Sequence, residues 1–346
     1  YKFRGANIYN ILNFENVFTG AKVIKLEQNY RSTQTILNAA NAVISNNIGR
    51  KSKSLWTDNG EGEKVNYTLY ENGYDEAEGV ASGIAEYVRD GWNYNDVAIL
   101  YRTNAQSRAL EEKLMIHNIP YKIYGGQNFY QRKEIKDILA YLKTIDNGLD
   151  GQAVKRIINV PKRGIGNTTI DRLQEYADFN DITFWEALVN AKDIDTIKNA
   201  ALSKLEPFVD LIGRLRAKEE FMSLKELAEA VIEDTGYIES LSQNETVEEV
   251  EARRENLDEF INKVVSYEES CKEAGEEPTL SGLLEEVALI ADIDNLDESE
   301  PHVMLMTLHS AKGLEFPIVY MTGMEDGLFP SYMTIVSDDS TEIEEE

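Results

Sequence analysis

The sequence predicts an α/β fold in which a doubly wound parallel sheet is interrupted by a long, mostly α-helical insertion. Strand-like and helical segments alternate up to Gly125, which is typical of such a sheet. Apolar residues then recur at helical spacing from residue 129 to about residue 290. After Pro301 the strand pattern returns in a segment too short to fold alone. We therefore expect the sheet to combine residues before Gly125 with residues after Pro301.

The part before Gly125 contains four strand-like runs and three amphipathic segments. Residues 97–101 (VAILY) form a continuous apolar run, typical of a parallel strand buried on both faces. A helix over 34–44 follows a polar loop, and the hydroxyl of Ser32 or Thr33 is expected to cap its first turn. The other predicted strands cover 21–26, 65–70 and 119–124, and the other helices cover 75–90 and 107–117.

The middle of the chain is predicted to be a helical domain. Ile135, Ile138, Leu142 and Ile145 follow the spacing of an amphipathic helix. Further helices are predicted over 168–177, 183–190, 200–216, 224–235, 247–274 and 279–289. The acidic, helix-breaking stretch 292–301 is then expected to be a linker.

Composition limits the classes of protein that this chain can be. Its 346 residues exceed one ordinary core, so two domains are expected. The single cysteine, Cys271, excludes an internal disulfide and a cysteine-based zinc site, and we expect no metal-binding residues. A reducing, cytoplasmic location is the natural setting. No apolar run reaches the ~20 residues that cross a bilayer, so no membrane contact is expected.

The formal net charge of −27 argues against nucleic acid as a partner, because phosphate binding favours a basic surface. The acidic residues are concentrated, however, in 245–259, 268–277, 292–300 and 338–346. An acidic chain can keep a basic groove. The net charge therefore weakens the nucleic-acid hypothesis without excluding it.

Residues 303–330 contain the most informative pattern, a polar loop between two strand-like runs. The loop carries a hydroxyl, an imidazole, an ammonium, a glycine and a carboxylate, from Thr307, His309, Lys312, Gly313 and Glu315. The simplest alternative is two core strands with a solvated connection. The composition of the loop favours a ligand or an interdomain contact, because α/β sheets present such groups at their ligand-binding edge.

Tyr30 and Arg31 occupy a second candidate position, on the loop before the predicted helix 34–44. Loops of this kind carry functional groups in α/β proteins, although an exposed Tyr-Arg pair is also common on any surface. At the start of the sequence, Tyr1, Phe3 and Arg4 alternate rings with cations. This pattern suits single-stranded nucleic acid, but an ordinary strand end would have it too.

A third candidate lies in the helical part, where Lys162 and Arg163 precede Gly164-Ile165-Gly166 and a predicted helix. Free amides of the turn and the helix start, with the two cations beside them, would hold a phosphate. The alternative is a tight interhelical turn with two exposed cations.

Together these stretches resemble the superfamily 1 ATP-dependent DNA helicases of the PcrA/UvrD/Rep type. YKFRGA is similar to the end of the third motif of that family and LEQNYRST to the fourth. LYRTNAQSR and FYQRKEIKDILAYL are similar to two accessory motifs, and TLHSAKGLEFPIVYMTGMEDGLFP to the fifth. Gly-Ile-Gly before a helix is similar to the hairpin of helix-hairpin-helix proteins that bind the DNA backbone.

The resemblance implies RecA-like parallel-sheet motor domains of the P-loop-NTPase type. Residues 1–20 would be the tail of the first motor domain. Residues 21–125 and 301–346 would be the two parts of the second motor domain. Residues 126–300 would be the inserted helical domain.

The resemblance also implies roles for the candidate residues. Arg31 would be the arginine finger at the γ-phosphate of ATP with Mg²⁺, and Tyr30 would stack on the adenine. Glu315 would contact the ribose or phosphate side, with Gly313 permitting close approach. Single-stranded DNA would be contacted by Tyr1, Phe3, Arg4, Arg102, Asn104 and His309, and the duplex junction by Lys162, Arg163, Gly164 and Gly166.

Other implied partners are the first motor domain and RNA polymerase or repair proteins. The sequence lacks a GxxxxGK[ST] phosphate loop and a strand motif of the DExx type, and the sixth motif is expected beyond Glu346. The chain alone is therefore predicted to be inactive as an ATPase and helicase. Two alternatives remain: a non-catalytic module that binds duplex DNA or other partners, and the motor part of a helicase-nuclease.

Overall fold

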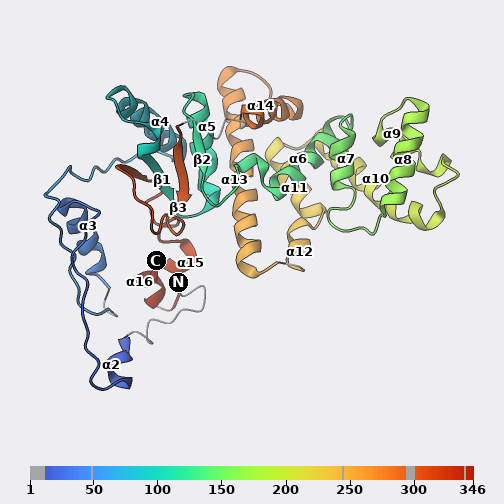
Figure 1. The fold of residues 1–346 in the computed structure, drawn as a ribbon. Coiled ribbons are helices and arrows are strands. Elements are labelled where there is room, and N and C mark those ends of the chain that lie inside the picture. Colours follow the sequence, from blue (N-terminus) through green and yellow to red (C-terminus); the bar gives the residue numbers. More distant parts are fainter. Residues whose placement is uncertain (1–11, 48–49, 244, 294–300, 339) are drawn as a thin grey trace.

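The computed structural model describes residues 12–47, 50–243, 245–293, 301–338 and 340–346. Its sheet has four parallel strands in the order β2-β3-β1-β4 (Figure 1). The strands are β1 (Val97–Tyr101), β2 (Tyr121–Ile123), β3 (Val303–Thr307) and β4 (Ile318–Met321). Because β3 lies between β2 and β1, residues from both sides of the insertion form one sheet. The predicted α/β fold is confirmed.

The core of the sheet is built around β1 and β3. Ile99 of β1 pairs with Leu305 of β3, and both side chains are fully buried. The helices α4 (Gly73–Arg89) and α5 (Ser107–Ile116) add Ile84 and Leu110 to the same core. Each of these two strands has a strand on either side, which explains why the sequence of β1 is apolar throughout.

The insert is an elongated array of helices that extends away from the sheet (Figure 1). Of its helices, α13 (Val247–Ala274) lies close to the sheet, whereas α8 (Asn167–Asn180) and α9 (Phe184–Val189) lie at the far end. The core of the insert is separate from that of the sheet and includes Tyr141, Phe208 and Phe260. The other insert helices are α6 (Lys133–Asp146), α7 (Gly151–Ile157), α10 (Asn199–Glu219), α11 (Leu224–Asp234), α12 (Tyr237–Leu241) and α14 (Leu280–Ile293).

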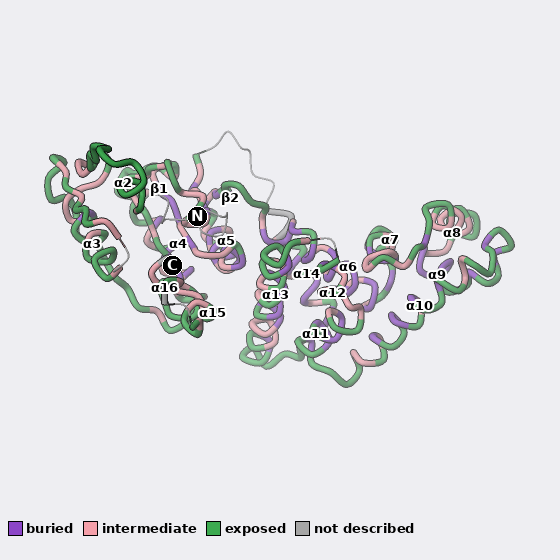
Figure 2. The backbone as a smooth tube through the Cα atoms, turned by 90° about the horizontal axis from the view of Figure 1, so that it is seen from below, coloured by how far each residue is buried: buried purple, intermediate pink, exposed green. Residues whose placement is uncertain are grey.

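The remaining helices are short or lie outside both cores. In Figure 2 exposed residues prevail along α2 (Phe14–Val17) and α3 (Gln34–Ile44). The predicted bounds 34–44 and 247–274 agree with α3 and α13 at every residue. Short helices that were not predicted are α2, α7, α12, α15 (Tyr332–Ile335) and α16 (Ser340–Glu345), with 3₁₀ turns at Tyr94–Asp96, Asn104–Gln106, Phe129–Gln131 and Ala191–Asp193.

Two of the predicted strands are wrong. Residues 21–26 and 65–70 belong to none of the strands in the described part of the chain, and Leu26 and Leu69 are 79% and 81% exposed. Apolar alternation favours extended backbone, but a strand also needs a neighbour with which to pair. Close to residues 21–26, the backbone makes an isolated parallel β-bridge between Gln28 and Trp56. The predicted linker 292–301 also begins too early, because α14 continues to Ile293, and residues 294–300 lie outside the described residues.

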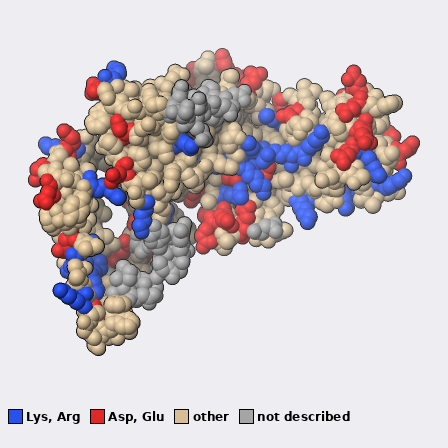
Figure 3. Space-filling view, viewed as in Figure 1, with Lys and Arg blue, Asp and Glu red and all other residues tan. Residues whose placement is uncertain are grey.

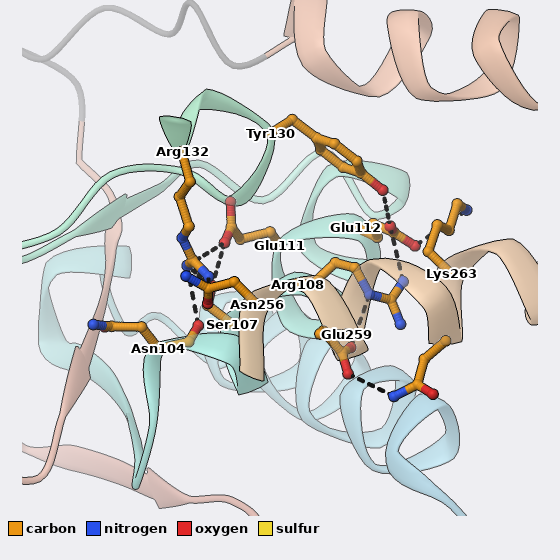
Figure 4. A network of polar contacts seen from close by, with 11 residues as sticks. Asn104, Ser107, Arg108, Glu111, Glu112, Tyr130, Arg132, Asn256, Glu259 and Lys263 are labelled. Atoms are coloured by element: carbon orange, nitrogen blue, oxygen red, sulfur yellow. Dashed lines mark hydrogen bonds and ion pairs between the residues drawn. The ribbon is translucent and has the colours of Figure 1, made fainter. Parts of the chain in front are cut away.

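Buried charges join the sheet domain to the insert (Figure 4). Arg108 of α5 is 1% exposed, and its guanidinium lies 2.8 Å from Glu259 of α13 and 3.0 Å from Glu112 of α5. Burial alone would lower the pKa of Arg108, but Glu112 and Glu259 raise that pKa above its ordinary value. Lys263 of α13 approaches Glu112 to 3.4 Å. The network thus joins the facing sides of α5 and α13.

Arg132, which precedes α6, adds a second set of contacts to this junction. Its guanidinium donates to Ser107 Oγ and Asn256 Oδ1, each at 2.8 Å, and to the Asn104 carbonyl at 3.0 Å. Ser107 and Asn104 belong to the sheet domain and Asn256 belongs to α13. One buried side chain therefore connects the loop after β1, the start of α5 and the insert.

We expect Arg108→Met to lower the free energy of unfolding by about 3–5 kcal/mol, because it leaves Glu259 without its cation and Glu112 with Lys263 alone. The matched control is Arg254→Met. Its exposed guanidinium lies 3.7 Å from Glu251, and its loss should cost less than about 1 kcal/mol. Urea unfolding followed by circular dichroism measures both variants. Equal losses would show that the junction charges do not stabilise the fold.

Candidate nucleotide and nucleic-acid interface

Two residues expected at a nucleotide, Arg31 and Glu315, meet in the folded chain. Arg31 Nε lies 2.8 Å from Glu315 Oε2, although the two segments flank the whole insert in the sequence. Both side chains are exposed, at 52% and 70%, so the ion pair contributes at most about 1 kcal/mol. A pair this weak leaves the guanidinium able to exchange its partner for an anionic ligand.

The loop that carries Arg31, residues 28–33, is shaped by its own polar side chains. We call it the arginine loop. Asn29 Oδ1 accepts the backbone N–H groups of Arg31 at 2.9 Å and Ser32 at 2.8 Å. The Tyr30 hydroxyl donates to Gln28 Oε1 at 2.9 Å, while the residue is 78% exposed. The ring is thus held at its hydroxyl end and remains accessible for stacking.

The helix α3 that follows this loop is not capped by a hydroxyl, so the predicted cap is wrong. Thr33 is the N-cap residue, but its side chain makes no capping hydrogen bond. The N–H groups of Gln34 and Thr35 instead donate to the carbonyls of Gly60 at 2.8 Å and Glu61 at 3.1 Å. Carbonyls from a segment distant in the sequence have therefore replaced the local cap.

The β3–β4 loop carries the other predicted nucleotide residues. Thr307 Oγ1 donates to Ser310 Oγ at 3.0 Å and accepts the Ser310 N–H at 3.2 Å, which closes a turn directly after β3. Gly313 has a φ of +91°, a conformation that favours glycine. His309 and Glu315 are both exposed on this loop.

Arg102, Asn104 and His309, the residues expected on a DNA track, follow the carboxyl ends of neighbouring strands. Tyr101 at the end of β1 pairs with Thr307 at the end of β3, so the two following loops share one edge of the sheet. Arg102 Nε lies 2.6 Å from Glu346 Oε1. Partial burial raises the pKa of the Glu346 carboxyl, but Arg102, the Thr334 hydroxyl and the Ser331 backbone together outweigh this and lower that pKa overall.

The Gly-Ile-Gly turn lies far from this edge, between α7 and α8 of the insert (Figure 1). Lys162 is exposed, whereas the Arg163 guanidinium is directed into the insert. Arg163 Nη1 donates to the Ile157 carbonyl at 2.9 Å and Nη2 to the Tyr141 hydroxyl at 2.7 Å. Arg163 therefore holds the loop in place, and Lys162 is the cation that faces solvent. Tyr1, Phe3 and Arg4 lie outside the described residues.

The charge on the surface is unevenly distributed. Figure 3 shows Lys and Arg gathered over the middle of the insert, and Asp and Glu gathered near the exposed end of α13. Lys133 and Arg156 are exposed neighbours on α6 and α7, where Arg156 Nη2 donates to the Lys133 carbonyl at 3.2 Å. An acidic chain can thus retain a local basic surface.

Sequence reasoning missed the residues that shape the arginine loop. Asn29 could have been found, because asparagine before a turn commonly accepts from the backbone two and three residues on. Asn59 gave no local signal, because its contacts reach the carbonyls of Tyr30 and Ser32 across a long separation in sequence.

Over the described ranges, no cluster of three or more His, Cys, Asp or Glu side chains is arranged to hold a metal ion. The same part of the chain contains no helix that is both long and apolar enough to cross a bilayer. The groups present at the loops are a guanidinium, a phenol ring and a carboxylate, and the planar guanidinium matches the geometry of a phosphate.

Residues 24–346 match a family model described as the UvrD-like helicase C-terminal domain. The chain is 49% identical over 346 residues to the ATP-dependent DNA helicase PcrA of Staphylococcus aureus (strain Mu50). The matched region covers 100% of this chain and 47% of that relative. The chain is 47% identical, with the same coverage, to the ATP-dependent DNA helicase PcrA of Staphylococcus epidermidis (strain RP62A). The chain spans about half the length of the curated relatives that it matches.

We expect Arg163→Ala to lower the free energy of unfolding by about 2 kcal/mol or more, because buried carbonyls lose a charged donor. Lys162→Ala, one residue away and exposed, should change it by less than about 0.5 kcal/mol. Thermal and urea unfolding of the two variants test the contrast. If both variants were as stable as the parent chain, Arg163 would be free to serve a ligand rather than the loop.

Proposed function

This chain belongs to the UvrD-like helicase C-terminal domain family, and we propose that it supplies the second RecA-like motor domain of an ATP-dependent 3′-to-5′ DNA helicase and translocase. Residues 21–125 and 301–346 are its two parts, residues 126–300 are the inserted helical domain, and residues 1–20 belong to the first motor domain. The observation that carries the proposal is the Arg31–Glu315 pair, because it joins the arginine loop to the β3–β4 loop.

In this proposal Arg31 is the arginine finger. A planar, permanently charged guanidinium suits the negative charge that spreads over the oxygens of a transferring phosphoryl group. Tyr30 offers an exposed ring to the adenine, and Glu315, beside Gly313, contacts the ribose or phosphate side. ATP is the substrate with Mg²⁺ as cofactor, and the groups that hold Mg²⁺ belong to the first motor domain.

The DNA contacts fall into two groups. Arg102, Asn104 and His309 share one edge of the sheet and are proposed to face single-stranded DNA. At the duplex junction, Lys162 and the backbone of the turn at Gly164 and Gly166 meet phosphates, and Arg163 supports them by holding the turn. Tyr1, Phe3 and Arg4 are proposed to extend the single-strand contacts by stacking and charge. The partners are thus DNA and the first motor domain, with RNA polymerase or repair proteins as further candidates, in the cytoplasm.

In the complete protein we expect Arg31→Ala to lower kcat for ATP by about 10³-fold or more, because the cation at the phosphoryl group is lost. Affinity for single-stranded DNA should change little. The matched control is Arg89→Ala, which removes an exposed arginine that pairs with Glu86 at 3.5 Å. Steady-state ATPase assays and DNA-binding titrations measure both. Loss of DNA affinity with kcat preserved would assign Arg31 to the DNA track instead.

The chain by itself should neither hydrolyse ATP nor unwind DNA. Its 346 residues contain no GxxxxGK[ST] loop and no DExx strand motif, so the loop lysine and the carboxylates of the phosphate site have to come from the first motor domain. Phosphate release from the purified chain, with and without single-stranded DNA, tests this expectation. DNA-stimulated release above the buffer background would overturn it.

A further inference from the structure

Residues 55–62 form a strap that lies against the arginine loop. The Trp56 N–H donates to the Glu27 carbonyl at 3.1 Å, and the Asn29 N–H donates to the Trp56 carbonyl at 2.8 Å. Further along the strap, the carbonyls of Gly60 and Glu61 accept hydrogen bonds from the first two backbone N–H groups of α3. At Gly62 a Cβ would lie 2.4 Å from the Thr33 side chain, so only glycine allows this close approach. The strap therefore contacts the loop at both of its ends.

Asn59, in the middle of the strap, holds the backbone on either side of Arg31. Its Nδ2 donates to the Tyr30 carbonyl at 3.1 Å and to the Ser32 carbonyl at 3.3 Å. From within the loop, Asn29 accepts the N–H groups of Arg31 and Ser32. The peptide groups around Arg31 are thus held from two sides, by one asparagine that donates and one that accepts.

The neighbouring residue of the strap, Asp58, acts on Tyr30 through one intermediate. Gln28 Nε2 donates to Asp58 Oδ2 at 2.9 Å, and Gln28 Oε1 accepts from the Tyr30 hydroxyl at 2.9 Å. This chain of hydrogen bonds orients the amide of Gln28. The strap thereby reaches both residues that are proposed to meet the nucleotide.

We propose that Asn59 is a positioning residue of the motor, which sets the direction of Arg31 and Tyr30 from outside the nucleotide site. The inference rests on the proposed function. Arg31 and Tyr30 are largely exposed, so packing does little to fix them. The hydrogen bonds to the backbone on either side of Arg31 set the point from which both side chains extend. Asn59 contacts the loop carbonyls rather than the Arg31 guanidinium, so its effect passes through the backbone.

Loss of Asn59 should affect catalysis and stability to different extents. Asn59 is exposed, and the carbonyls that it would release can be hydrated, so its loss should alter the thermal midpoint very little. A catalytic group displaced by about 1 Å, in contrast, can lower a rate by as much as about 100-fold. The signature of a positioning residue is therefore a fall in kcat without a matching fall in stability.

The test compares Asn59→Ala and Asn59→Asp in the complete helicase. Aspartate keeps the shape of asparagine but cannot donate to a carbonyl. Both variants should lower kcat for ATP by about 10-fold to 100-fold, with aspartate at least as impaired as alanine and with KM for ATP changed less than kcat. The matched control is Asn46→Ala, because Asn46 Nδ2 also donates to two backbone carbonyls, those of Ala42 at 3.3 Å and Val43 at 3.1 Å, at the far end of α3. It should keep the kcat of the parent.

Each outcome decides the matter. Support requires reduced kcat in both Asn59 variants, an unchanged Asn46→Ala control and thermal midpoints close to the parent value. If Arg31→Ala abolishes turnover while both Asn59 variants keep parental kcat, Asn59 has no positioning role and the proposed function stands. If Asn46→Ala lowered kcat as much as the Asn59 variants do, the fall in kcat would reflect general destabilisation, and the inference would be overturned. If Arg31→Ala itself leaves kcat intact, the proposed function fails, and the inference fails with it.

Discussion

The structure depends on the pairing of β3 between β1 and β2. Residues 124–302, which include the helices α6 to α14, separate β2 from β3 in the sequence, yet Tyr121 pairs with Val303 and Tyr101 with Thr307. Because β2 and β3 are parallel, the insert has to leave at the carboxyl end of β2 and return at the amino end of β3. The pairing also places the loops after β1 and β3 side by side, and these loops carry the proposed DNA and nucleotide residues. Without β3, neither loop would have a fixed position.

The two kinds of ion pair in the chain suit two different tasks. At the junction, Arg108 and Arg132 are almost fully buried, so breaking their contacts leaves charges that water cannot easily compensate. The Arg31–Glu315 pair is exposed and contributes little to stability. Buried pairs therefore hold the insert on the sheet, while the exposed pair can exchange a carboxylate for a phosphate at small energetic cost.

Local patterns predicted the elements that depend on local physics. The helical period marked α13 at every residue, and the apolar run VAILY marked β1, because both signals lie within the element itself. Tyr30 and Arg31 of the arginine loop were also found from the sequence, although their proposed roles came from resemblance to a family. The strands expected over 21–26 and 65–70, and the hydroxyl cap of α3, were wrong because pairing partners and competing carbonyls decide them.

The sequence by itself determined the fold class, the family and the residues that can carry charge, stacking or a free amide. Only the tertiary structure decided which of these residues meet. It turned Arg163 into the insert and left Lys162 exposed, it paired Arg31 with Glu315, and it brought Asn59 onto the arginine loop. The physical reason is that composition and periodicity act within a few residues, whereas hydrogen bonds and ion pairs between distant segments exist only once the chain has folded.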